Sequence, residues 1–151
     1  MKRVYRILVL LFFMAICFNN STAQTRGFGI GVIVGEPTGI SLKLWNSGTT
    51  AFDAGIAWSL GKDDKLHLHA DHLWHNFNVF RNPKMALYYG IGGRIYSDND
   101  TRVGVRGVIG INYFFTEVPL DAFLEIVPVF QVLPDTKFGF NAGIGMRFFF
   151  D

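Results

Sequence analysis

The segment that decides the fold is FGFNAGIGMRFFF, residues 138–150, because its residue types alternate with a period of two. Every second position is apolar, namely Phe138, Phe140, Ala142, Ile144, Met146, Phe148 and Phe150. The positions between them are mostly small or polar, namely Gly139, Asn141, Gly143, Gly145, Arg147 and Phe149. A period of two predicts an extended strand with one apolar face. Because the other face carries glycine and arginine, a barrel with an apolar exterior and a polar interior fits better than a soluble sheet.

The same alternation recurs along the chain, between short segments of turn-forming residues. It predicts eight strands, each long enough to cross a membrane when tilted, at residues 27–34, 38–45, 50–60, 65–75, 85–96, 101–114, 120–130 and 138–150. The expected fold class is all-β, an eight-stranded antiparallel up-and-down transmembrane β-barrel. Closure is required in lipid, because an open sheet leaves backbone groups without partners.

Residues 1–23 resemble a cleavable export signal. Lys2, Arg3 and Arg6 form the charged start, residues 7–18 are apolar, and Ser21-Thr22-Ala23 supplies small residues for cleavage. The apolar run is shorter than the roughly 20 residues of a spanning helix, although a retained anchor is the alternative. We therefore expect a signal peptide at 1–23, a barrel domain at 24–151 and localisation in the bacterial outer membrane. Cys17 would leave with the signal, so no disulfide is expected.

The charge balance argues against nucleic-acid binding. Removing the three basic residues of the signal leaves 11 basic against 12 acidic residues, a formal charge of −1. A nucleic-acid-binding domain normally carries a basic surface instead.

Assigning one parity to each strand separates charge from apolar surface. No Asp, Glu, Lys or Arg falls on the outward positions, as a lipid-facing surface requires. The charged residues collect on the inward positions, namely Lys43, Asp53, Asp71, Arg94, Arg102, Arg106, Glu125 and Arg147, together with nine glycines. Since buried charges must be paired, we expect Asp53, Asp71 and Glu125 to accept from Arg94, Arg106 and Arg147. The lumen would then be a closed plug and no open pore.

Three further expectations follow from this assignment. Aromatic residues near strand ends would form interfacial girdles, or be ordinary strand aromatics. Pro128 has no backbone N–H, so a bulge or the end of its strand is expected there. With both chain ends in the periplasm, the outer connections at 35–37, 61–64, 97–100 and 131–137 are short, which leaves a small surface for a protein partner.

All four histidines lie between residues 67 and 75. His67, His69, Asp71 and His75 share the inward face, and alternate histidines on one strand can share a metal ion. The alternative is that they extend the polar network of the lumen. Because no third ligand from another strand is identifiable, no metal and no other cofactor is expected.

A hydrolase is another alternative for the residues around the histidines. If the turn at 61–64 pairs Gly61 with Lys65, Ser59 lies across from His67, and a nucleophile would stand beside a base. Asp71 is four residues from His67, about 13 Å along the strand at about 3.3 Å per residue, so it cannot orient that imidazole. We expect no catalytic residue, and retain Ser59, His67 and His69 only as a possible polar cluster.

Several motifs carry a resemblance to a known family. They include Gly35-Glu36-Pro37-Thr38-Gly39-Ile40-Ser41, Tyr88-Tyr89-Gly90-Ile91-Gly92-Gly93-Arg94, Phe123-Leu124-Glu125-Ile126-Val127-Pro128-Val129 and Gly143-Ile144-Gly145-Met146-Arg147. On these motifs the chain resembles the small OmpA-type and OmpX-like outer-membrane barrels, and more closely compact barrels of unassigned function. The resemblance implies export, insertion by the barrel assembly machinery and an eight-stranded barrel, with no catalytic residues. The terminal aromatic signal of such barrels is displaced here, since Asp151 follows Phe150.

The sequence thus predicts a non-enzymatic outer-membrane barrel with a structural or surface-interaction role. Its expected partners are outer-membrane lipid and the assembly machinery, and a monomer is expected. One alternative is a lipid-modifying barrel enzyme. Another is a secreted lipocalin-like barrel for a small ligand, which would need the apolar positions inside and the charges and glycines outside.

Overall fold

The computed structural model describes residues 27–59 and 65–150. The expected signal peptide and the turn at 61–64 lie outside the described residues, as does Asp151. Eight strands make up the fold, namely β1 (Phe28–Gly35), β2 (Gly39–Trp45), β3 (Thr50–Ser59), β4 (Lys65–Asn76), β5 (Met85–Ser97), β6 (Thr101–Phe114), β7 (Leu120–Leu133) and β8 (Lys137–Phe150).

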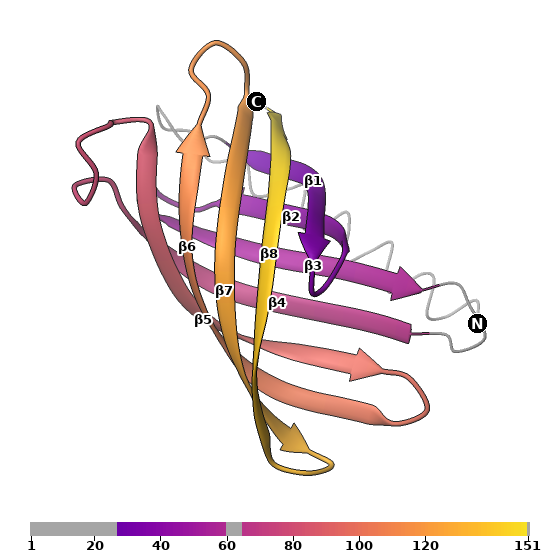
Figure 1. Cartoon of the computed structure of the whole chain (residues 1–151). Helices are drawn as coiled ribbons and strands as arrows, with labels where there is room; N and C mark the ends of the chain where they lie inside the picture. Colours follow the sequence, from indigo (N-terminus) through magenta and orange to yellow (C-terminus); the bar gives the residue numbers. More distant parts are fainter. Residues whose placement is uncertain (1–26, 60–64, 151) are drawn as a thin grey trace.

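The strands form one closed antiparallel barrel in which each strand pairs with its neighbours in the chain (Figure 1). The barrel closes where β8 returns to β1, with Phe28 opposite Phe150 and Gly35 opposite Gly143. The expected fold class is therefore confirmed, and most strand bounds match the expected ones to within a residue or two. The largest difference is in β7, which continues to Leu133. The described part of the chain contains no helix long and apolar enough to cross a membrane.

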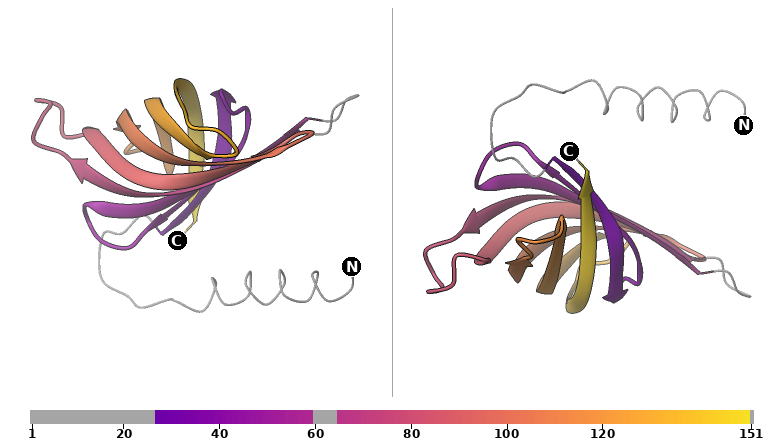
Figure 2. Two further views of the ribbon diagram at one scale, coloured as in Figure 1. Left: turned by 90° about the horizontal axis from the view of Figure 1, so that it is seen from below. Right: turned by 90° about the horizontal axis from the view of Figure 1, so that it is seen from above.

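The strands are strongly tilted, so strands on opposite walls cross in projection (Figures 1 and 2). The connections between β2 and β3, β4 and β5, and β6 and β7 share one end of the barrel with the C-terminal end of β8. The turns between β1 and β2, β5 and β6, and β7 and β8 lie at the opposite end. We call this second end the turn end.

The two faces of every strand have the predicted character. Consecutive residues show it most clearly on β7, where Ile126 is 57% exposed and Val127 is 2% exposed. Outward apolar side chains are exposed around the whole wall, as Phe52, Ile91 and Phe140 illustrate. No Asp, Glu, Lys or Arg of the described strands occupies an outward position. The exterior is a continuous apolar belt.

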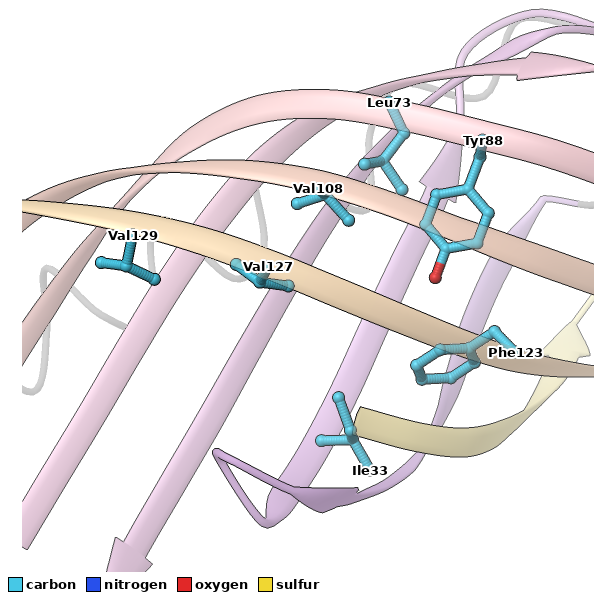
Figure 3. Close-up of a cluster of buried hydrophobic side chains, with 7 residues drawn as sticks. All are labelled: Ile33, Leu73, Tyr88, Val108, Phe123, Val127 and Val129. Carbon is cyan, nitrogen blue, oxygen red and sulfur yellow. The ribbon is translucent and has the colours of Figure 1, made fainter. Parts of the chain in front are cut away.

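The lumen also contains an apolar layer beside its charged residues. Its buried residues are Ile33, Leu73, Tyr88, Val108, Phe123, Val127 and Val129, which point inward from five strands (Figure 3). A second buried cluster of Trp45, Ala51, Ala86, Phe114 and Phe149 fills the end that carries the C-terminus. The interior is thus packed with both apolar and charged side chains, as expected for a barrel of eight strands.

Inward glycines make room for side chains that cross them from the next strand. A Cβ atom at Gly55 would overlap the ring of His69, its register partner on β4. A Cβ atom at Gly92 would overlap the carboxylate of Asp71, its register partner across β4 and β5. The glycines therefore allow long polar side chains to lie flat against the barrel wall.

The expectation for Pro128 was wrong in its detail. The strand does not end there, and the register shift between β6 and β7 lies between Val103 and Gly104, opposite Gln131 and Leu133. Near Pro128, by contrast, Gly107 and Val108 of β6 have no paired residue on β7. Pro128 lies close to Gly107 at this point. A local gap in the ladder accommodates the missing N–H.

Candidate functional site

The candidate site is the charged interior of the barrel. Four carboxylates (Asp53, Asp71, Asp121 and Glu125) and three cations (Lys43, Arg106 and Arg147) are at most 8% exposed. Isolated buried charges are strongly unfavourable, so each of them needs partners within the lumen. These partners are contributed by strands on several sides of the barrel.

Arg147 on β8 links three strands. Its Nε and Nη2 donate to the two oxygens of Asp121 on β7 at 3.1 and 3.3 Å. Its Nη1 donates to Asp53 Oδ2 on β3, and its guanidinium lies 4.0 Å from the ring centroid of Phe123. Bidentate pairing fixes the plane of the guanidinium group as well as its position, so Arg147 connects β8 to β3 and β7 across the lumen.

Arg106 on β6 forms a second set of ion pairs. Its Nε lies 3.0 Å from Asp71 Oδ1, and its Nη2 lies 3.6 Å from Glu125 Oε1. The Tyr88 hydroxyl donates to Glu125 Oε2 at 2.7 Å. These contacts connect β4, β5, β6 and β7 across the interior.

Lys43 on β2 lies at the other end of the charged set. Its Nζ is 2.7 Å from Asn112 Oδ1, 2.8 Å from His75 Nε2 and 3.8 Å from Asp121 Oδ2. Since an ammonium group only donates, His75 Nε2 accepts, and His75 Nδ1 then donates to the Thr49 carbonyl oxygen at 3.2 Å. The contacts hold both Lys43 and one tautomer of His75 in place.

Asp53, His69 and Asp71 form the tightest group of possible metal ligands. His69 Nε2 lies 3.7 Å from Asp53 Oδ1 and 4.0 Å from Asp71 Oδ2, and the three atoms lie within 4.8 Å of one another. Asp53, from β3, is the ligand that the sequence did not supply. Both carboxylates are also paired with arginine, so the three side chains belong to the ion-pair network of the lumen.

The proposed pairing of Ser59 with His67 is wrong. In the observed register Ser59 lies opposite Lys65, and His67 lies opposite Ala57. The pairing is thus offset by two residues from the expected one. His67 instead contacts the rings of His69 and Tyr96, with centroids 5.6 and 6.0 Å apart.

Two expected members of the ion-pair network lie elsewhere. Arg102 pairs with Asp98 in the β5–β6 turn at 3.0 Å. Arg94 forms no ion pair within the described ranges, so the prediction that it donates to a lumen carboxylate was wrong. Both arginines lie toward the turn end, near the end of β5 and the start of β6.

The barrel is similar in fold to two solved structures. The fold resembles the N-terminal β-barrel domain of Pseudomonas aeruginosa OprF with a TM-score of 0.62 and 15% identity, covering 82% of this chain and 95% of that one. It is also similar to Neisserial surface protein A, with a TM-score of 0.47 and 13% identity, covering 82% and 93%. No family model matches the chain. No curated protein matches it either.

The fold is a closed eight-stranded antiparallel barrel like that of the OprF domain. This agrees with the fold that the sequence motifs implied.

Within this barrel, sequence reasoning missed three residues of the network. Asp121 has the parity of Glu125, four positions away, so its inward direction was available from the alternation. Asn112 and Tyr88 carry no charge, and only the three-dimensional contacts reveal their roles. Asp121 is the most important omission, since it pairs with both Arg147 and Lys43.

Proposed function

We propose that the chain is an integral protein of the bacterial outer membrane, closed by its own side chains, with a structural or surface-interaction role and no enzymatic activity. The observation that carries this proposal is the contrast between an uncharged exterior and a charged interior. The export signal at 1–23, the barrel domain at 24–151, insertion by the barrel assembly machinery and a monomeric state belong to the same proposal.

The exterior supports a lipid environment. Apolar side chains that point outward are about half exposed on every wall, including Val32 on β1, Trp58 on β3 and Ile144 on β8. Soluble monomers rarely expose a contiguous apolar patch of more than a few hundred Å². A lipocalin-like soluble barrel would need the opposite arrangement of faces, so the observed faces favour the membrane.

The interior supports a closed lumen. Arg147 reaches from β8 to β3 and β7, and Arg106 reaches toward β4 and β7. The buried apolar layer of Figure 3 adds seven further side chains to this interior. We therefore propose that the barrel carries no steady ion current.

The register supports a non-enzymatic role. A lipid-modifying barrel of the kind considered above needs a hydroxyl nucleophile beside a base. In the register of β3 and β4, Ser59 is the partner of Lys65 and His67 is the partner of Ala57, so the serine and the histidine are not direct cross-strand partners. The fully buried charged groups of the lumen are paired with one another and face away from the proposed lipid surface.

Fractionation and electrophoresis test the proposal. The protein from its native host should be recovered in the outer membrane, and the folded protein should change its mobility in SDS only after boiling. In planar bilayers the folded protein should give no steady conductance. Recovery in the soluble periplasm without a mobility change would overturn the membrane assignment, and steady conductance would overturn the closed lumen.

A further inference from the structure

At the turn end the lumen opens into a cavity of about 470 Å³. Its wall comes from the β1–β2 turn and from β3, β4, β5, β6 and β8. The charged and aromatic polar side chains in this wall are Glu36, Lys65, His67, Arg94, Tyr96 and Arg102. The cavity volume is in the range of small-molecule sites, about 300–1,000 Å³.

Arg94 is the exceptional member of this wall. It is half-buried, it points inward, and its Nε is buried without a hydrogen-bond partner. Its register partners are His69 on β4 and Gly104 on β6, and neither carries a carboxylate. The deeper arginines, Arg106 and Arg147, are both paired with acids. Glu36 lies in the same wall, but it forms no ion pair with Arg94. A buried guanidinium nitrogen without a hydrogen-bond partner indicates that an anion from outside completes the site.

His67 supplies a second unfilled position. The residue is 6% exposed, it lines the cavity, and its Nε2 has no hydrogen-bond partner. Its ring is held by edge contacts with His69 and Tyr96, which fix its orientation. A buried polar atom that is left unpaired in the protein alone is expected to find its partner in a ligand or water.

Charge within the cavity favours an anion. Lys65 and Arg94 are cationic and form no ion pair within the described chain, whereas Arg102 is held by Asp98. Glu36 is the single acidic residue of the described wall. The wall thus carries an excess of positive charge next to neutral donors.

We infer that this cavity binds the oxyanion group of a small molecule, a phosphate or a carboxylate, with Arg94 as its principal ligand and His67 and Lys65 as additional contacts. A guanidinium group matches two oxygens of such an anion at once, which an ammonium group cannot do. The inference concerns the barrel itself, so it holds whether or not the proposed membrane location is correct.

Calorimetric titration with inorganic pyrophosphate tests the site. The full barrel is folded in a maltoside detergent, which has no phosphate group, at about 0.15 M salt to screen weak surface binding. We expect saturable one-site binding that Arg94→Gln weakens about tenfold or more and Lys65→Gln weakens less.

Two variants serve as matched controls. Arg81→Gln makes the same chemical change in the β4–β5 connection at the far end, and Lys137→Gln removes a charge from the turn end outside the cavity. Both should bind pyrophosphate as the unaltered barrel does. The boiling-dependent mobility shift confirms that each variant is folded, and if Arg94→Gln fails to fold, Lys65→Gln provides the comparison.

A second experiment distinguishes a soluble anion from a lipid headgroup as the natural ligand. Pyrophosphate binding is repeated in nanodiscs of neutral lipid and of lipid with anionic phosphate headgroups. Equal binding in both supports a soluble ligand, whereas competition by the anionic lipid supports a headgroup in the cavity. Absence of saturable binding in detergent and in neutral nanodiscs, or equal affinity in Arg94→Gln, would overturn the inference.

Discussion

Asp53 on β3 and Asp71 on β4 are direct cross-strand partners, and both carboxylates point into the closed lumen. Like charges directly opposite one another destabilise a sheet. Here Arg147 pairs with Asp53, Arg106 pairs with Asp71, and His69 Nε2 lies within 4.0 Å of both carboxylates. The repulsion is thus offset from three sides, which ties the stability of the β3–β4 pair to residues on β6 and β8.

Arg147→Met should destabilise the barrel severely, because it leaves Asp53 and Asp121 buried without their main cation. The expected loss in the free energy of unfolding is about 3–5 kcal/mol, measured by urea unfolding in lipid vesicles. Arg102→Met is the control, since the Arg102–Asp98 pair is partly exposed, and its loss should stay below about 1 kcal/mol. Equal losses of unfolding free energy in Arg147→Met and Arg102→Met would contradict a stabilising role of the Arg147 ion pairs.

The two acids Asp71 and Asp121 should respond differently to neutralisation. Asp71→Asn removes an ion pair with Arg106 but also relieves the repulsion from Asp53. Asp121→Asn removes the charge that serves both Arg147 and Lys43. The loss of unfolding free energy in Asp71→Asn should therefore be smaller by about 1 kcal/mol or more. A larger loss in Asp71→Asn would show that the cross-strand repulsion is negligible.

Gly55→Val should strain the wall, since the new side chain would occupy the place of the His69 ring. A loss of about 1–3 kcal/mol is expected, and His69→Ala in the same chain should recover part of it. Gly139→Val has open space around it and should change the unfolding free energy by less than about 0.5 kcal/mol. Additive effects of Gly55→Val and His69→Ala would mean that the two residues are not coupled.

The fold was predictable because one physical rule, alternation of apolar and polar residues, operates along every strand. It placed Ile126 outside and Arg147 inside without knowledge of any contact. The pairing partners inside the lumen were only partly predictable, since they depend on register between strands. A shift of the β3–β4 pairing by two residues retains the same faces while moving Ser59 from His67 to Lys65.

The wrong pairing expected for Arg94 also comes from the unknown register between strands. Alternation shows that Arg94 points inward, but the tilt and stagger of the strands decide which level of the lumen it reaches. At that level it meets Gly104 and the cavity rather than an acid. The candidate anion site is therefore a property of the register and is not visible in the pattern of residues.

The β5–β6 turn should show a measurable dependence on pH. The Asp100 backbone N–H donates to Asp98 Oδ1, and this bond, with the nearby Arg102 guanidinium, lowers the pKa of the Asp98 carboxyl group. Because the pKa is lower in the folded state, the stabilisation is present above the unfolded-state pKa and is lost as the pH falls through the folded value. Carbon NMR titration should give a lowered pKa for Asp98, and Arg102→Gln should raise it only slightly. A large rise in Arg102→Gln would show that the ion pair, not the backbone bond, is the main cause.

Charge on the outer wall should be tolerated at the rim and not at the middle. Ile126 lies near the centre of β7, whereas Phe138 lies near the start of β8. In lipid vesicles Ile126→Arg should lower the unfolding free energy by about 2–4 kcal/mol, and Phe138→Arg by about 1 kcal/mol or less. Similar small losses at both positions would mean that the wall does not face hydrocarbon.

The proposed membrane location requires that the outer wall at Ile126 lies in hydrocarbon, and a spin label at this position measures that environment. A nitroxide spin label is attached to Ile126→Cys, in a chain that also carries Cys17→Ser, and the protein is folded into lipid vesicles. We expect dissolved oxygen, which concentrates in the bilayer, to relax the label more strongly than a water-soluble nickel complex does. Stronger relaxation by the nickel complex would place Ile126 in water and would contradict the assignment of the apolar wall to lipid.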